Sequence, residues 1–280
     1  MTSAAPALVR VPLAHGEASH PTRLPRVRIL GSRVHLVSVG ETVDHIESWI
    51  QAPAGRCRRV TVTGFHGLWE AHQNPALREI LNGAELWVPD GIAPVWAARL
   101  RGRHNVERVP GAEIMREFFS RAARKGYSSY FYGGTEATLA ALERKLAGDY
   151  PGHRVAGSFS PPFRPVTSAE DREIVDRINA ARPDVLWVGL GMPKQDLWIH
   201  ERLHRLDVPV AIGVGAAFAF VAGTVPRCPG WIGRIGFEWV YRFLREPEKL
   251  WRRDLIDGPR FLWHLAVELA GVRSANRRDL

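Results

Sequence analysis

The chain contains 280 residues, and 45% of them are hydrophobic, enough to bury the core of one large domain or of one domain with an appendage. The formal net charge of +9 favours an anionic partner, whether a nucleic acid, an acidic membrane surface or a phosphate-bearing substrate. The two cysteines, Cys57 and Cys228, form no CxxC pair. We therefore expect neither a disulfide framework nor a cysteine zinc site, which is typical of a reducing compartment.

Short β-branched stretches alternate with amphipathic ones along most of the chain. Residues 1–25 lack a continuous apolar run and are predicted to be a flexible lead-in, not a signal peptide. Strands are predicted at 33–39, 58–64, 85–90, 128–134, 153–159, 184–191 and 210–215. Helices are predicted at 41–52, 92–102, 111–126, 135–150 and 167–183. This alternation predicts an α/β core over residues 26–229, with a mainly parallel sheet and helices on both faces.

One uncharged stretch, residues 208–226, has the length of a membrane-spanning segment. A spanning helix needs about 20 predominantly apolar residues, but Pro209 and several glycines interrupt this one. We predict a buried strand that runs into a turn.

The composition changes over residues 230–280, which show no strand pattern and are predicted to form two or three helices broken at Pro247 and Pro259. Arginines are interleaved there with Trp231, Trp239, Trp251 and Trp263. Aromatic rings at headgroup depth and cations on anionic lipid would suit a membrane-associating appendage. The alternative is that these tryptophans pack within the appendage's own core.

Glycine or polar residues follow four of the predicted strands, in the strings "VTGFHG", "VPDG", "FYGG" and "VGLGMPKQ". Ligands of parallel α/β folds bind at the carboxyl ends of the strands, so these four strings should line one crevice. Their convergence predicts a binding site more strongly than any one of them does.

Individual residues of this crevice have two interpretations each. Asp90 is either a general base or the N-cap of the following helix. His66 is either a polar contact to a ligand or a buried histidine with its own partners. Gly133 and Gly134 either admit a ligand close to the backbone or form a simple strand-to-helix turn.

Lys194 and Gln195 follow Pro193, which suits the first turn of a helix. A lysine there opposes the helix dipole unless an anion binds beside it, which favours a functional role. The chain contains no GxGxxG, no P-loop, no HExxH and no DxD. A dinucleotide fingerprint, a P-loop and a metal site of the DxD type therefore find no support, and no cofactor is expected.

Six strings resemble, in order, the WecG/TagA/CpsF glycosyltransferase family, over about residues 35–255. They are "VTGFHGLWEAHQNPALREILNGAELWVPDGIAPVWAARLRG", "ERVPGAEIM", "YFYGG", "PDVLWVGLGMPKQDLWI", "AIGVGAAFAFVAGTVPR" and "GFEWVYRFLREPEKLWRR". The resemblance implies a Rossmann-like core with a C-terminal appendage. It also implies an inverting, metal-independent transfer of a sugar from a UDP-sugar to an undecaprenyl-diphosphate-linked acceptor, in surface polysaccharide biosynthesis at the cytoplasmic face of the plasma membrane.

The resemblance also implies roles for particular residues. Asp90 matches the proposed base, Thr63 the threonine beside it, and Gln195 a glutamine near the nucleotide or sugar. The appendage arginines that match the diphosphate-contacting region are Arg242, Arg245, Arg252 and Arg253. The other residues predicted to bind substrate are His66, Arg108, Gly133, Gly134, Gly189, Gly191, Lys194, Asp196 and Arg227.

Three departures from the family pattern leave the transferred sugar open. Asp196 replaces the usual glutamate, His66 stands in a "TGFHG" string where "T-x-N" is common, and "RCP" at 227–229 replaces the frequent "RAP". N-acetylmannosamine, its uronic acid, glucuronic acid, glucose and galactose are all conceivable donor sugars for such a chain.

Two other classes fit the residues less well than a glycosyltransferase does. A nicotinamide-dependent oxidoreductase would use a similar layout but lacks its glycine-rich fingerprint, and a nucleic-acid-binding protein would explain the charge but not the clustering of arginine with tryptophan. The expected partners are a UDP-sugar, a lipid-diphosphate-linked acceptor and an anionic membrane surface, with no nucleic acid and with homo-oligomerisation left open. We expect a cytoplasmic protein, peripheral on the inner face of the plasma membrane.

Overall fold

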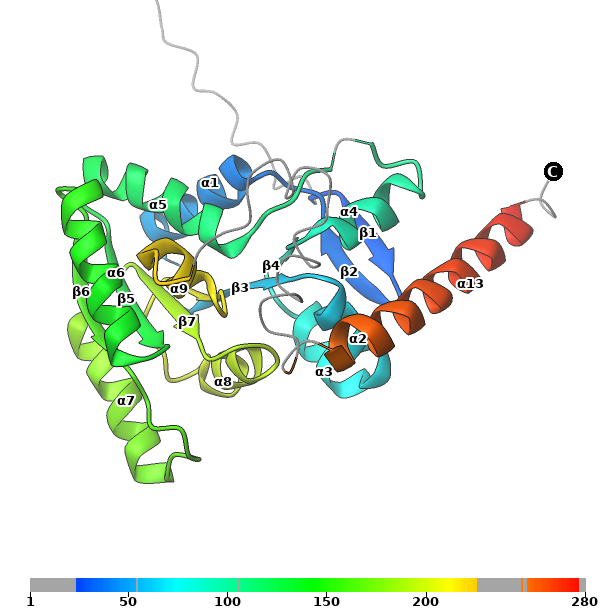
Figure 1. Ribbon diagram of the computed structural model, residues 1–280. Coiled ribbons are helices and arrows are strands. Elements are labelled where there is room, and N and C mark those ends of the chain that lie inside the picture. Colours follow the sequence, from blue (N-terminus) through cyan, green and yellow to red (C-terminus); the bar gives the residue numbers. More distant parts are fainter. Residues whose placement is uncertain (1–23, 54, 105, 226–247, 249–250, 277–280) are drawn as a thin grey trace, which may run out of the picture.

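The computed structural model describes residues 24–53, 55–104, 106–225, 248 and 251–276. Six strands form one parallel sheet in the order β4-β3-β8-β7-β5-β6, and a two-stranded antiparallel hairpin, β1-β2, lies beside it (Figure 1). The strands are β1 (Arg26–Ile29), β2 (Ser32–His35), β3 (Arg58–Thr63), β4 (Leu86–Pro89), β5 (Ser128–Gly133), β6 (Arg154–Phe159), β7 (Val185–Gly189) and β8 (Val210–Gly213). The predicted α/β fold with a mainly parallel sheet is confirmed.

Helices cover both faces of the large sheet. Helices α1, α5, α6 and α9 pack their apolar sides on one face, and α7 and α8 pack on the other. Their bounds are α1 (Val39–Gln51), α5 (Gly111–Lys125), α6 (Glu136–Asp149), α7 (Ser168–Ala181), α8 (Lys194–Arg202) and α9 (Ala217–Ala222). A further cluster of buried apolar residues joins the hairpin to α2 (Phe65–Gln73), α3 (Pro75–Asn82), α4 (Ile92–Arg99) and α13 (Gly258–Asn276).

The strand predicted at 33–39 is present only in part, as β2, which ends at His35. It belongs to the β1-β2 hairpin, whose turn residues Leu30 and Gly31 have φ of 48° and 84°. Helix α1 then begins at Val39, because Ser38 and Glu41 form a reciprocal capping box. A strong helix-start signal therefore overrides the β-branched character of the residues before it.

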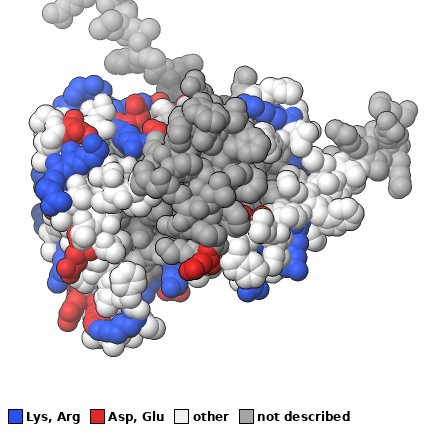
Figure 2. All heavy atoms as spheres, viewed as in Figure 1, with Lys and Arg blue, Asp and Glu red and all other residues white. Residues whose placement is uncertain are grey.

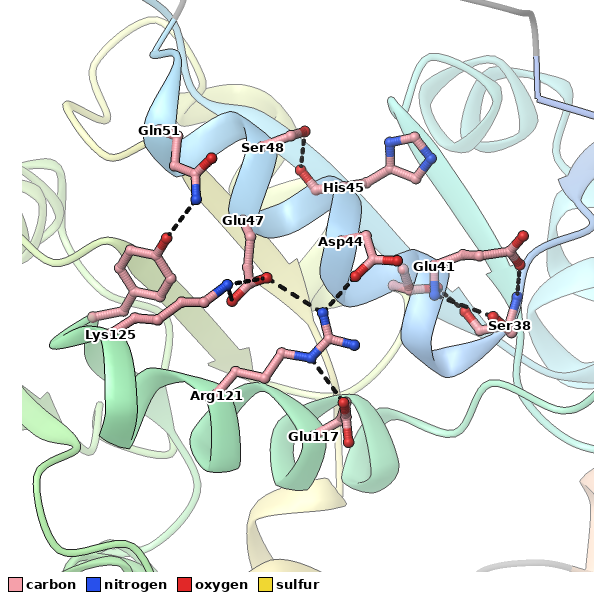
Figure 3. A network of polar contacts seen from close by, with 12 residues as sticks. Ser38, Glu41, Asp44, His45, Glu47, Ser48, Gln51, Glu117, Arg121 and Lys125 are labelled. Atoms are coloured by element: carbon pink, nitrogen blue, oxygen red, sulfur yellow. Dashed lines mark hydrogen bonds and ion pairs between the residues drawn. The ribbon is translucent and has the colours of Figure 1, made fainter.

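An ion-pair network attaches α1 to α5 (Figure 3). Arg121 of α5 lies between the carboxylates of Asp44 and Glu47 on α1 and also donates to Glu117 at 2.8 Å. Lys125 donates to both carboxylate oxygens of Glu47 at 2.8 Å. Hydrogen bonds to these carboxylates, above all to Asp44, raise the pKa of Arg121. The two helices are thus joined through charge as well as through their apolar sides.

The described part of the uncharged stretch at 208–226 forms the buried strand β8, as predicted, followed by a short helix, α9, that was not predicted. Among the described helices, none combines the length and the apolar character that crossing a bilayer requires. The predicted domain boundary at 229–230 lies outside the described residues.

Helix α13 projects from the body but is anchored at its base (Figure 1). Phe261 and Leu265 are buried in the cluster that contains the hairpin and α2. Glu268 accepts a hydrogen bond from the Leu30 amide at 3.0 Å and forms an ion pair with Arg101. The helix break predicted at Pro259 is wrong, because the π-helical turn Arg252–Asp257 runs directly into α13, whose second residue is Pro259; Pro247 lies outside the described residues.

Candidate active site

The ends of β3 and β4 bring Asp90 and Thr63 together. The Asp90 amide donates to the Thr63 carbonyl oxygen at 3.0 Å, which continues the pairing of the two parallel strands by one residue. Asp90 is half-buried, and the N-cap of α4 is the next residue, Gly91, without a side-chain cap. The capping interpretation of Asp90 is therefore wrong, while its interpretation as a base stays a prediction.

His66 and Arg108 belong to segments that adjoin Asp90. His66 lies in the first turn of α2, directly after β3, and is half-buried. The residue after Arg108, Val109, donates its amide to the Pro89 carbonyl at 2.8 Å, so the backbone around Arg108 runs beside the end of β4. The structure thus places both segments next to the carboxylate that the sequence marks as the base.

The ends of β5 and β7 form a second part of the same edge. Gly133 pairs with Gly189, and the Gly134 amide donates to the Gly189 carbonyl at 3.2 Å. Gly133 has φ of 112°, and a Cβ there would lie 2.6 Å from the Gly189 carbonyl carbon, so no other residue fits. No side chain therefore separates the backbones of β5 and β7 where the two strands end. The tight glycine turn predicted at 133–134 is present.

The segment from Gly191 to Asp196 crosses from β7 past β8 to β3. Lys194, its exposed member, is the first residue of α8. Gln195 accepts a hydrogen bond from the Gly215 amide at 2.8 Å, next to the end of β8. Asp196 accepts one from Thr61 Oγ1 of β3 at 2.9 Å. This segment therefore links the glycine-rich half of the edge to the half that carries Asp90.

Asp196 faces the protein interior. Its side chain is 0% exposed, and burial raises the pKa of its carboxyl to about 6, against the opposing effects of the Thr61 hydrogen bond and of the Arg59 charge. Gln195, at 2% exposure, also points inward. Of the neighbouring candidates, Lys194 alone presents its side chain freely to solvent.

The arginines predicted in the appendage are only partly described. Arg252 is exposed and lies in a π-helical turn over Arg252–Asp257, directly before α13. Arg253 belongs to the same turn, but its side chain is not described. Arg227, Arg242 and Arg245 lie outside the described residues.

No cluster of three or more histidine, cysteine, aspartate or glutamate side chains is placed to hold a metal ion in the part of the chain that the structure describes. The dispensability of metal stays a prediction for experiment.

A family model for the WecG/TagA/CpsF glycosyl transferases matches residues 27–275. The chain belongs to this family. It is 34% identical, over 67% of its own length and 70% of the relative's, to an N-acetylglucosaminyldiphosphoundecaprenol N-acetyl-beta-D-mannosaminyltransferase of Bacillus spizizenii. A protein of the same name from Bacillus subtilis is 31% identical, over 63% of this chain and 67% of the relative.

As a WecG/TagA/CpsF glycosyltransferase, the protein has its candidate active site at the strand edge that carries Asp90, the glycine turns and Lys194. Three residues beneath this edge were not predicted from the sequence: the polar residues Arg59 and Thr61, and Met192, whose sulfur accepts from Thr63. A signal for two of them was present: β3 reads "RRVTVT", where Val60 and Val62 alternate with polar residues although both faces of the strand are covered. Such polar residues in a buried strand must have partners.

Proposed function

We propose that this protein transfers N-acetylmannosamine, or a related uronic acid or hexose, from a UDP-sugar to a sugar on a lipid diphosphate. The names of the two Bacillus relatives support both the sugar and the acceptor. They also specify a β-linked product, which requires inversion because UDP-hexosamines carry the sugar in the α configuration. The observation that carries the proposal is the gathering of Asp90, the bare glycine turns and Lys194 at one edge, in a chain that the family model matches almost throughout.

Asp90 would act as the general base. The acceptor hydroxyl has a pKa far above neutrality, so its attack on the anomeric carbon requires a base within about 2.6–3.2 Å. As the new C–O bond forms, the hydroxyl proton passes to the Asp90 carboxylate and the old C–O electron pair leaves with UDP. The backbone bond from Asp90 to Thr63 would hold the carboxylate in place during this step.

Lys194 would offset the charge that develops on the departing diphosphate. It is exposed at the start of α8, where the helix dipole also favours negative charge. The bare backbone at Gly133 and Gly134 would let the donor approach the sheet edge closely. Interactions that strengthen as charge develops lower the barrier more than those that bind the ground state equally well.

The outer face of α13 supports peripheral binding to a membrane. Leu262, Trp263 and Val267 are 54%, 70% and 55% exposed, and Figure 2 shows largely uncharged surface along this helix. An apolar helix face with a tryptophan suits the headgroup region, and the chain's excess of basic residues favours anionic lipid. We propose that α13 rests on the inner face of the plasma membrane, where a lipid-linked acceptor would be held.

The test is release of UDP from a panel of UDP-sugars, with and without a lipid-diphosphate-linked N-acetylglucosamine acceptor, in the presence of EDTA. Acceptor-dependent release from UDP-N-acetylmannosamine is the expected result. Release that requires added divalent cation would refute metal independence alone. No release from any donor, together with no thermal stabilisation by UDP, would refute the proposed activity.

A further inference from the structure

Two threonines on one face of β3 hold the two ends of the segment that leads into α8. Thr63 Oγ1 donates to Met192 Sδ at 3.3 Å, and Thr61 Oγ1 donates to Asp196 Oδ1 at 2.9 Å. Residues two apart on a strand face the same side, which is why both reach this segment. Lys194 lies between the two attachments.

The attachment at Asp196 is enclosed in the protein. The side chain is 0% exposed, and its second oxygen, Oδ2, has no hydrogen-bond partner among the described residues. The Arg59 guanidinium donates to the Asp196 carbonyl at 3.4 Å and to the Ile80 carbonyl at the end of α3. The carboxylate thus fixes the first turn of α8 against β3, together with the charge of a buried arginine.

Gln195 attaches the same turn to the loop after the neighbouring strand. It accepts a hydrogen bond from the Gly215 amide, two residues after β8, so two adjacent residues of α8 bind β3 and the loop that follows β8. Such an arrangement leaves the turn little freedom to move along or across the sheet edge. Because Lys194 directly precedes Gln195, its backbone position is set by these buried bonds.

We propose that Asp196, through its hydrogen bond to Thr61, is a positioning residue that sets the place of Lys194 and of the α8 N-terminus, and thereby the affinity for the UDP-sugar. The donor itself contacts neither Asp196 nor Thr61. The inference rests on the proposed function. It replaces the expectation from the sequence that Asp196 binds substrate directly.

Thr61 offers a matched pair of variants. Thr61→Val keeps the shape of the side chain and removes the hydroxyl donor, whereas Thr61→Ser keeps the hydroxyl and removes a methyl group. Loss of a hydrogen bond to a charged acceptor corresponds to roughly a tenfold effect or more. We expect Thr61→Val to raise the KM for the donor, and the Kd for UDP by calorimetry, about tenfold with kcat changed less than about threefold. Thr61→Ser should stay within about threefold of the wild type in both.

The outcomes separate the inference from the function it rests on. A wild-type protein without acceptor-dependent UDP release refutes the proposed function. An active wild type with Thr61→Val unchanged in donor KM, or with Thr61→Ser impaired as much as Thr61→Val, overturns the positioning role. If Thr61→Val does not fold, Thr61→Ala removes the same hydroxyl donor without placing a methyl group against the Asp196 carboxylate. UDP should then bind several-fold more weakly, and an unchanged Kd would overturn the proposal.

Discussion

Replacing Asp196 by asparagine should change how the stability of the protein depends on pH. Burial raises the pKa of this carboxyl from 3.8 to about 6, so the folded state binds its proton more tightly than the unfolded state does. The stability that this proton confers is fully present below pH 3.8 and is lost as the pH rises through about 6. The side chain is fully buried, so solvent screening does not reduce the effect.

The size of the effect follows from the two pKa values. Compared with the fully protonated state, the free energy of unfolding of the wild type should be lower by about 1 kcal/mol at about pH 4.5 and by about 3 kcal/mol at about pH 7.5. The difference between the two pH values is about 2 kcal/mol. The asparagine side chain of the variant cannot titrate, so the free energy of unfolding of wild type minus variant should fall by that difference between the two pH values. Subtracting the variant cancels the titration of all other groups.

Urea unfolding at both pH values, followed by tryptophan fluorescence, measures this difference from the midpoints and slopes. Asp207→Asn is the control, because Asp207 is exposed in the loop before β8. A wild-type-minus-Asp196→Asn difference that is independent of pH would show that Arg59 and Thr61 fully compensate the buried charge, and the reasoning would be refuted.

Three further predictions follow from the same structure. Asp90→Asn should lower kcat by about 10²- to 10⁴-fold with an unchanged thermal midpoint, and near-normal turnover in the UDP-release assay would exclude Asp90 as the base. Gly133→Ala should destabilise the protein by about 2 kcal/mol or more in urea unfolding, because the φ of Gly133 is 112° and the new Cβ would meet the neighbouring strand. Gly148→Ala in α6 is the control: its Cβ would have no atom within 4 Å, so it should be neutral or stabilising by up to about 1 kcal/mol. Trp263→Ala should weaken sedimentation with anionic vesicles without lowering the thermal midpoint. Phe261→Ala, at a side chain that is 1% exposed, should instead destabilise the protein by about 3 kcal/mol. Equal vesicle binding by wild type and Trp263→Ala would contradict the membrane-facing role of α13.

Most of the core's secondary structure could be predicted because its signals are local. Apolar spacing, caps and glycine stops act within a few residues, and they placed the helices before and after β5 and the strand β4, which directly precedes Asp90. The hairpin at 26–35 was missed because Leu30, the first residue of its Leu30-Gly31 turn, has a positive φ that leucine rarely adopts. The resemblance to the glycosyltransferase family also came from ordered local strings, and the family model confirms it.

The sequence by itself determined which residues stand at the strand ends and which family the chain belongs to. The tertiary structure decided the order of the strands, with β8 between β3 and β7, and hence which residues lie beside one another. Thr61 and Asp196 are 135 residues apart, and no local pattern relates them. Their hydrogen bond exists because that strand order lays the start of α8 against the polar face of β3. Spacing within one segment cannot reveal such a contact, because it depends on how distant segments pair.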